Sequence, residues 1–399
     1  MMIEVFSTLE EIAPFAESWD LLAGSIPFRS WAWLSCWWRH YGSTGGAKLY
    51  VLGVRDETGR LVGIAPWYVH RSAAKGRVLR WLGTGEVCSD YLSVLCQPVD
   101  TDRVTDALAK YLSGPECIQS ARQAWDLLEV DGIAADDRAV TQLLAKLGRR
   151  KCIQHENTPI HCWRLTLPET WDEYVMMVSK GHRKKLRRAD RDLFDTGRAV
   201  LRVVEKANQL DSVWDTLIEL HQKRRNMLGE PGCFISSLYA AFHREVTREL
   251  LASGQLQLSW LELDGQTVAV MYQLISQGIT YVYQLGIETD KLDDEPGHLI
   301  IAATIKRAIK QGGRAIDFLR GDEPYKPHFR AEPRDMLALR IVPNRALPLL
   351  RNQIYLGSRE IKRWWTKTGP AYDVPLITPD SAAAADTGNA VWGFTETTS

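Results

Sequence analysis

The chain has 399 residues, of which 45% are hydrophobic and 25% charged, the composition of an ordinary globular protein. Lysine plus arginine (49) balance aspartate plus glutamate (49), so no overall field favours nucleic acid or a membrane surface. No apolar run approaches the roughly 18 residues of a membrane span, and the first residues lack the basic and apolar regions of a signal peptide. We therefore expect a cytoplasmic protein of two domains, with no transmembrane segment and no DNA partner.

The seven cysteines are odd in number and widely scattered, which fits reduced thiols better than a disulfide framework. Two pairs, Cys152 with His155 and His161 with Cys162, imitate the spacing of metal ligands. The second pair is adjacent in an expected strand, where neighbouring side chains point to opposite faces. A tetrahedral site is awkward with that geometry, and we predict no metal.

The first half of the chain alternates helices and strands. Strands are expected at residues 4–7, 48–55, 61–70, 78–82, 91–95, 125–130 and 160–165, and helices at 8–22, 30–41, 102–112 and 137–147. Thr8 and Glu11 have the spacing of a capping box at the start of the first helix. The sequence Asp-Glu-Thr-Gly at 56–59 predicts a hairpin between two β-rich runs.

The second half repeats this order of elements. Helices are expected at residues 170–194, 210–227, 236–252 and 297–311, and strands at 200–205, 257–262, 267–275, 279–285, 315–319 and 337–342. Shared order without shared residues indicates two copies of one α/β fold. We predict domains at 1–165 and 166–345, a C-terminal helix at 346–368, and a disordered tail at 369–399.

A polar turn follows the expected strand at 315–319. Gly321 ends the strand, and Asp322, Glu323, Tyr325 and Lys326 place two carboxylates, a phenol and an ammonium within five residues. Strand ends that lead into polar turns are where α/β proteins tend to build sites, because the scaffold is rigid and the loop can vary. A surface turn alone needs only the glycine and one polar residue.

A second candidate segment is the start of the helix expected after residue 296. Pro296 and Gly297 allow a tight turn into the helix, and His298 follows them. The first amides of a helix have no partner inside it and can bind a phosphate or a carbonyl, although an ordinary helix start explains the sequence equally well. Asp317 lies on the following strand, and we expect both segments to face one cleft.

These motifs resemble the CelD-type acetyltransferase family of the GNAT superfamily, which is related to the FemABX peptidyltransferases. The most specific match is Gly-Asp-Glu-Pro-Tyr-Lys at 321–326, followed by Pro-Gly-His-Leu-Ile-Ile-Ala-Ala-Thr-Ile at 296–305. Phe-Arg-Ser-Trp-Ala-Trp-Leu at 28–34, Leu-Val-Gly-Ile-Ala-Pro-Trp at 61–67, Ser-Asp-Tyr-Leu at 89–92 and Ser-Lys-Gly-His-Arg-Lys-Lys-Leu-Arg-Arg at 179–188 are similar to further family signatures. The resemblance covers roughly residues 3–345.

The resemblance implies two tandem GNAT-like domains, each a mixed, largely antiparallel sheet flanked by helices, and transfer of an acyl group to an amine. Acetyl-CoA is the implied co-substrate, at Pro296, Gly297 and His298, and no cofactor is expected to be bound tightly. The sequence departs from the superfamily at 291–298, where the pyrophosphate loop keeps one glycine and contains acids that would repel a pyrophosphate. Aminoacyl-tRNA, the donor of the FemABX branch, therefore stays open as an alternative.

Acyl transfer to an amine needs a base, donors for the oxyanion and a well-held acyl donor. Asp322 or Glu323 is a candidate base or ammonium ligand, Lys326 a candidate for oxyanion stabilisation or phosphate binding, and Tyr325 a candidate acid for the leaving thiol. The alternative is structural: Asp322 caps the turn while Glu323 and Lys326 form a solvated pair. We expect direct attack of the amine on the bound donor, without a covalent enzyme intermediate.

Four further residues are candidates for substrate binding. Asp317 lies on the site strand, and His221 lies late in a helix, where a histidine interacting with the helix C-terminus is the alternative. Asp90 and Tyr91 begin an expected strand of the first half and could reach an interdomain cleft, but a turn and a core aromatic explain them equally well.

The most basic segment is Lys180–Arg191, with seven lysines and arginines in twelve residues. A solvated helix is one interpretation, and contact with a phosphate, as in a nucleotide-sugar, a lipid, a membrane surface or tRNA, is the other. We predict an N-acetyltransferase whose acceptor is an amino sugar or related precursor of a cell-envelope polysaccharide, on family context alone. Two alternatives are a FemABX-like aminoacyl transferase and a non-catalytic accessory subunit associated with polysaccharide-synthesis machinery.

Overall fold

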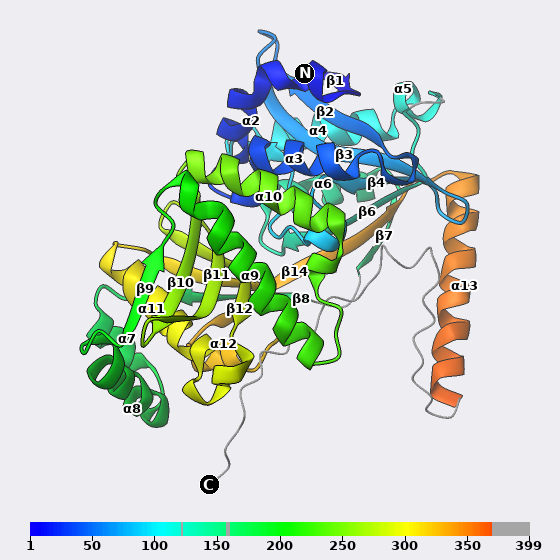
Figure 1. Cartoon of the computed structure of the whole chain (residues 1–399). Helices are drawn as coiled ribbons and strands as arrows, with labels where there is room; N and C mark the ends of the chain where they lie inside the picture. Colours follow the sequence, from blue (N-terminus) through cyan, green and yellow to red (C-terminus); the bar gives the residue numbers. More distant parts are fainter. Residues whose placement is uncertain (121–122, 157–159, 369–399) are drawn as a thin grey trace. The chain divides into compact units, whose positions relative to one another are not determined.

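The computed structural model describes residues 1–120, 123–156 and 160–368 of the chain (Figure 1). The described chain divides into two compact units. Of the described residues, the first contains Met1–Ile160 and residues 336–368, and the second contains His161–Asp335. The tail at 369–399, for which we predicted disorder, lies outside the described residues.

The first unit is built on a mixed sheet. In order of pairing its strands are β1 (Met2–Phe6), β2 (Lys48–Arg55), β3 (Leu61–Ser72), β4 (Gly76–Trp81), β6 (Leu127–Ala134) and β14 (Glu332–Val342). β5 (Leu95–Cys96) pairs with β3, and β7 (Ile153–Glu156) pairs with β14. β4 and β6 run parallel, and the other pairs are antiparallel.

The first unit has seven α-helices in the described residues, and two of them show that both faces of the sheet are covered. They are α1 (Leu9–Ile12), α2 (Ala16–Ala23), α3 (Trp31–Tyr41), α4 (Thr101–Ser113), α5 (Pro115–Ile118), α6 (Arg138–Arg149) and α13 (Ala346–Thr368). Trp37 of α3 contacts Tyr68 of β3, whereas a Cβ at Gly63 of the same strand would overlap Val104 of α4. Positions 63 and 68 have opposite parity, so α3 and α4 lie on opposite faces.

The second unit has a sheet of the same kind. In order of pairing its strands are β8 (Ile160–Thr166), β13 (Ala315–Arg320), β12 (Ile279–Ile287), β11 (Gln266–Ser276), β10 (Leu256–Leu263) and β9 (Ala199–Val203). β12 and β13 are parallel, and the other pairs are antiparallel.

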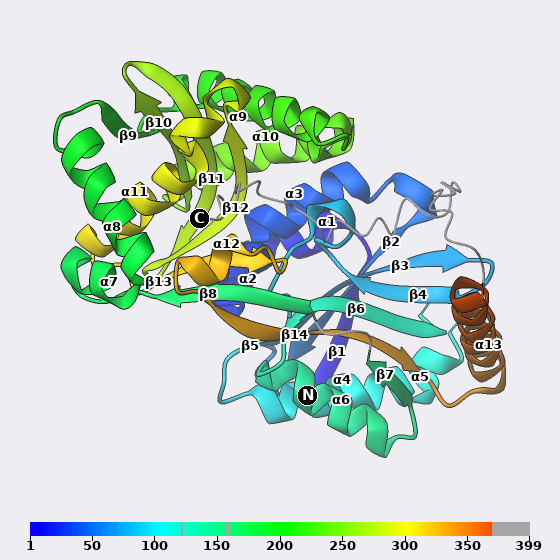
Figure 2. The same cartoon turned by 90° about the horizontal axis from the view of Figure 1, so that it is seen from below.

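The helices of the second unit also form two layers. They are α7 (Trp171–Met177), α8 (Lys180–Ala189), α9 (Ala207–Met227), α10 (Ser237–Ala252), α11 (Pro296–Lys310) and α12 (Tyr325–His328), with short 3₁₀ segments η6 (Cys233–Ile235) and η7 (Thr289–Asp294). Figure 2 shows α9 and α10 on one side of the sheet and α7, α8 and α11 on the other. The single helix expected at 170–194 is divided, because the Ser179 side chain accepts the His182 amide and starts a new helix.

The two units share one strand order, which confirms the prediction that the chain repeats a single mixed α/β fold. Each has one parallel pair of neighbouring strands, and a helix (α4 or α11) precedes the second strand of that pair. The sixth strand is exchanged between the halves of the sequence. β8, from the end of the first half, pairs with β13, whereas β14, from the end of the second half, pairs with β6. The units therefore differ from the expected division at 165 and 345.

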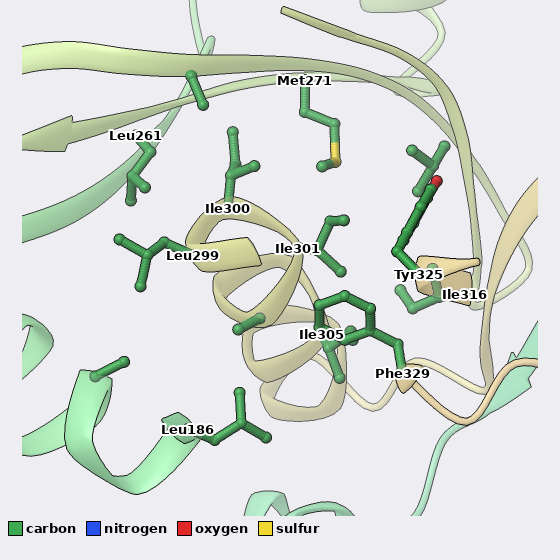
Figure 3. Packing of buried hydrophobic residues seen from close by; sticks show 14 of the residues in the cluster. Leu186, Leu261, Met271, Leu299, Ile300, Ile301, Ile305, Ile316, Tyr325 and Phe329 are labelled. Atoms are coloured by element: carbon green, nitrogen blue, oxygen red, sulfur yellow. The ribbon is translucent and has the colours of Figure 1, made fainter. Parts of the chain in front are cut away.

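The core of the second unit is organised by α11 (Figure 3). Leu299, Ile300, Ile301 and Ile305 of this helix are buried, and they belong to one apolar cluster with Ile316 of β13. Complete burial of a leucine or isoleucine side chain contributes about 1.5–3 kcal/mol. This cluster fixes α11 against the sheet, and with it the position of the first turn of the helix. No helix in the described residues is long and apolar enough to cross a membrane.

Candidate functional site

β12 and β13 are neighbours over only a short distance. Their parallel ladder joins residues 279–281 to residues 315–317. β12 continues to Ile287 and β13 to Arg320, with no ladder between them in the described part of the chain. An extended molecule that carries amide groups can pair with strand edges of this kind.

Each of these strands contains a β-bulge just beyond the ladder. In β12 the extra residue is Tyr283, between the partners of Tyr272 and Gln273 on β11. In β13 the extra residue falls between Asp317 and Arg320. Because bulges bend a strand and re-aim its side chains, two bulges at this point explain why the strands part.

Asp317 holds the bulge of β13. Its side chain is fully buried, one carboxylate oxygen accepts the Leu319 amide at 2.9 Å, and the other pairs with Arg164 Nε at 2.7 Å. Leu319 has a φ of +56°, a conformation that costs a non-glycine residue energy and needs support from its surroundings. The contacts of Asp317 therefore position the strand, and they do not favour the predicted role in substrate binding.

Lys326 lies inside the turn that follows β13. Its side chain is 1% exposed, and its ammonium donates to the carbonyl oxygens of Leu319 (3.2 Å), Arg320 (3.0 Å) and Gly321 (2.8 Å). The Glu323 carboxylate lies 2.7 Å away. These acceptors use all the donors that a lysine has. In this geometry Lys326 holds the turn together, which does not favour the predicted roles in oxyanion stabilisation or phosphate binding; those roles stay predictions.

Glu323 and Tyr325 are also committed to the structure of the turn. Glu323 is 7% exposed and curls over Gly321, where any side chain would collide with its carboxylate. The Tyr325 ring lies in the apolar cluster around α11 (Figure 3). Burial, and then the Glu323 charge, raise the pKa of Tyr325 well above its ordinary value. Neither contact pattern favours the predicted roles as base and acid, and the pair of Glu323 with Lys326 is buried rather than solvated.

Asp322 is the acid of this turn that remains accessible. Its side chain is 61% exposed and accepts the Trp163 indole N–H at 2.9 Å. His161 Nδ1 lies 3.2 Å from the same carboxylate, and His161 Nε2 lies 3.5 Å from Asp335. An imidazole between two exposed carboxylates can bind an ammonium group or move a proton.

The first turn of α11 is buried. Pro296, Gly297 and His298 are all buried, and Glu295, the residue before the helix, pairs with Lys185 of α8 without capping. His298 Nε2 lies 2.7 Å from Nε2 of His182. Burial, followed by nearby Lys185, lowers the pKa of His298 to about 2. His298 is therefore neutral and does not attract a phosphate by charge, whereas the helix N-terminus keeps its partial positive charge.

The face of β12 that is turned toward α9 and α10 carries a polar cluster. The Tyr283 hydroxyl lies 3.2 Å from His243 Nε2, and the Gln284 amide donates to the Tyr239 hydroxyl at 3.4 Å. Adjacent residues of a regular strand point to opposite faces, but the bulge lets both of these reach α10. His221 of α9 lies on this face and is 3% exposed. Burial, and then Arg225, lower its pKa to about 4, so His221 is a neutral base at pH 7.

Asp90 and Tyr91 belong to the first unit. Both are buried, and Tyr91 has a φ of +61°, so the expected strand at 91–95 is reduced to Leu95–Cys96. The Tyr91 carbonyl accepts a hydrogen bond from Arg29, whose side chain also pairs with Asp137 at 2.9 Å. These contacts are those of a folded loop, and the role of both residues in an interdomain cleft stays a prediction.

The sequence reasoning missed the partners of the predicted residues. His161 and Trp163 on β8 meet Asp322 across more than 150 positions of the chain, and Arg164 meets Asp317 in the same way. The exchange of β8 into the second unit creates these contacts, and no local sequence pattern predicts that exchange. Cys233 was also missed, although Gly232 immediately before it marks an unusual backbone position.

Comparisons with known proteins agree with the fold of the second unit. Residues 180–327 match the model of the family described as Acetyltransferase (GNAT) domain. A conserved protein of unknown function from Bacteroides thetaiotaomicron VPI-5482 is similar in structure, with a TM-score of 0.54 at 12% identity over 86% of this chain and 100% of that one. FemX is similar with a TM-score of 0.54 at 12% identity over 84% of this chain and 97% of that one. No curated protein matches the sequence.

Within the second unit, residues 180–327 are thus similar to a GNAT acetyltransferase domain. The fold of the chain is similar to that of FemX over 84% of its length, which agrees with the predicted relation to the FemABX proteins as far as the fold is concerned. The finer resemblance to the CelD-type family stays a prediction.

Proposed function

We propose that the second unit is an N-acyltransferase that moves an acyl group, acetyl in the first instance, from coenzyme A to an amine. The observation that carries this proposal is the pair of bulges that ends the β12–β13 ladder after three residue pairs. The pantetheine arm of coenzyme A is extended and contains two amides, which suit the edge of a strand.

The proposed donor runs along β12 toward the first turn of α11. There the amides of Gly297 and His298 point out of the helix, as helix N-termini do, and meet the diphosphate. The packing of the first turn of α11 keeps these amides in place, while Lys185 neutralises Glu295, the nearest acid on the chain. This arrangement supports coenzyme A in a loop without the usual glycines.

The proposed acceptor is an amine, and an amino sugar of a cell-envelope polysaccharide is the class that the sequence resemblance implies. Asp322 and Asp335 flank His161 and supply negative charge for an ammonium group. His221, which is neutral at pH 7 and lies on the α9 side of β12, supplies the base that removes the proton.

Isothermal titration of acetyl-CoA into the purified chain tests the donor. Gly297→Asp places a carboxylate at the helix start, where acids favour the helix but repel a phosphate, and Gly297→Asn has the same shape without the charge. A Cβ at Gly297 meets only side-chain atoms, the nearest at 3.8 Å, and circular dichroism of both variants checks that the rest of each side chain is accommodated at this buried position. Two like charges about 4 Å apart repel by roughly 1–4 kcal/mol, so we expect micromolar binding that the aspartate weakens about tenfold or more. Absence of binding to a folded protein would exclude coenzyme A as donor.

A second candidate is an aminoacyl-tRNA-dependent transferase. Four basic side chains of α8 are exposed, Lys180, Lys184, Arg187 and Arg188, and they form a positive surface suited to a phosphate backbone. Reversal of two charges, Lys184→Glu with Arg187→Glu, should abolish transfer from aminoacyl-tRNA and leave acetyl-CoA binding intact. If both activities are absent while the chain still complements a cell that needs it, the accessory role is favoured instead.

A further inference from the structure

A cysteine, a histidine and two glutamines meet where α9 and η6 face β12. Cys233 Sγ lies 3.8 Å from His221 Nε2 and 3.6 Å from Gln284 Nε2. The cysteine is partly exposed, whereas His221 is 3% exposed. The residue that carries the thiol thus reaches the surface, and the imidazole next to it is shielded from water.

The contacts of Gln222 determine which nitrogen of His221 faces the thiol. The Gln222 amide nitrogen donates to the Pro231 carbonyl at 2.8 Å, so its oxygen is the atom 3.2 Å from His221 Nδ1. That oxygen can only accept, so Nδ1 carries the proton and Nε2 has the free lone pair. The lone pair points at Cys233, which is the arrangement of a base beside a nucleophile whose tautomer is fixed by a third group.

The backbone around this group is built for close approach. Gly232 has a φ of +71°, and a Cβ there would overlap the Gln222 side-chain oxygen. Phe234 packs edge-on against the His221 ring, with ring centroids 5.1 Å apart. A glycine that no other residue can replace and an aromatic clamp hold the imidazole and the thiol beside each other.

We propose that Cys233, His221 and Gln222 form a nucleophilic site that takes up an acyl group as a protein thioester. His221 Nε2 removes the Cys233 proton, and the thiolate attacks the carbonyl carbon of a thioester. The new carbon–Sγ bond forms as the donor carbon–sulfur bond breaks, and the proton passes from His221 to the departing thiolate. The Gln284 amide provides a donor to the Cys233 sulfur throughout.

An amine then completes the transfer. It attacks the Cys233 thioester, its proton passes through His221 to Sγ, and the free thiol and an amide are left. This second step rests on the proposed function, and it replaces the direct attack expected from the sequence by two transfers in series. The Sγ to Nε2 distance of 3.8 Å is long for a hydrogen bond, as is common for such pairs before a substrate binds.

The test compares two cysteines in one protein. The full chain is incubated with S-acetyl-N-acetylcysteamine, a short thioester without a nucleotide, and acetylation of each cysteine is followed by peptide mass spectrometry. Cys96 is the comparison, because it is also partly exposed but its Sγ lies 3.7 Å from the Thr101 hydroxyl, and burial raises its pKa. General-base assistance gives about 10²-fold or more, so we expect Cys233 to react faster by that factor at pH 7. Equal rates at both cysteines would overturn the proposal.

A variant of His221 tests the contribution of its imidazole to the reactivity of Cys233. His221→Gln should reduce the acetylation rate of Cys233 to that of Cys96 and leave Cys96 unchanged. Cys36 and Cys117 are fully buried, so their labelling would reveal any variant that unfolds. An unchanged rate in a folded His221→Gln protein would contradict the proposed base.

Parallel incubation with acetyl-CoA separates this proposal from the proposed function. Acetylation of Cys233 by the short thioester but not by acetyl-CoA would support the nucleophilic site and reject coenzyme A as donor. Binding of acetyl-CoA and amine turnover by a Cys233→Ser protein at the normal rate would support the acyltransferase and reject the thiol intermediate.

Discussion

Replacement of Lys326 by methionine distinguishes a structural lysine from a catalytic one. Methionine keeps most of the length of the side chain and removes the charge. The buried Glu323 carboxylate, 7% exposed, then loses the ammonium 2.7 Å away, and three backbone carbonyls lose their donor. Removal of one partner of a buried ion pair costs about 3–5 kcal/mol, which is a large part of the stability of a typical domain.

Urea unfolding and hydrogen exchange of the segment 315–331 measure this loss. The second substitution Glu323→Gln, in the Lys326→Met background, removes the orphaned charge and should restore part of the lost free energy. Lys310→Met is the matched control, because Lys310 is exposed, and it should change the free energy of unfolding by less than about 0.5 kcal/mol. A Lys326→Met protein of normal stability that has lost acyl transfer would refute the structural role and restore the catalytic one.

Three further predictions concern packing and pH. A Cβ at Gly286 would lie 2.9 Å from a carbonyl oxygen of α9, so Gly286→Ala should lower the free energy of unfolding by about 1–3 kcal/mol, whereas Gly297→Ala should be close to neutral in the same urea titration. Burial alone would raise the pKa of Glu129, but Arg80 lowers it to about 2. The contribution of Glu129 to the free energy of unfolding is therefore fully present above pH 4.5 and is lost as the pH falls toward 2. Glu129→Gln should abolish this acid dependence, worth about 3 kcal/mol, and an unchanged pH profile would contradict the network. The pKa of His298 is lowered from 6.5 to about 2, so His298→Gln should make the fall in melting temperature below pH 6.5 shallower; an identical slope would show that His298 is not the group that resists protonation.

Local patterns in the sequence predict most of the elements. The hairpin β10–β11, the helices α9 and α10 and the Thr8–Glu11 capping box depend on periodicity and capping chemistry that a single segment contains, and the structure confirms them. The repeated order of elements also predicts the repeated fold. β7 and α5, which were missed, are each four residues long, too short for a period to be recognised.

The site was predicted less well because its chemistry depends on burial and on distant partners. Asp322, Glu323, Tyr325 and Lys326 look equivalent in the sequence, yet Asp322 is 61% exposed and Lys326 is 1% exposed. The alternation of the turn residues gives no indication of which ones fold inward. The pairing of β8 with β13, which supplies the partners of Asp322, likewise depends on tertiary structure and not on a local sequence pattern.

The two units show how one strand order can serve different purposes. In the first unit the parallel ladder pairs Val78 with Leu127 and Leu79 with Leu128, and the next residues, Arg80 and Glu129, form an ion pair across the two strands. The pair is reinforced by Lys75 at 3.0 Å and by Arg340 at 2.7 Å.

In the second unit the ladder ends at Tyr281 and Asp317, and the next residues are Val282 and Phe318, which are apolar and cannot make such a link. Bulges follow in both strands of this pair. Charges that tie two strands together add stability and occupy the space between them, whereas strands that part leave backbone groups for a ligand. The parallel ladder of the first unit is also short, with two residue pairs, and β6 has a bulge opposite Leu337 and Leu339. What distinguishes the units at this point is the Arg80–Glu129 ion pair, which has no counterpart at Val282 and Phe318.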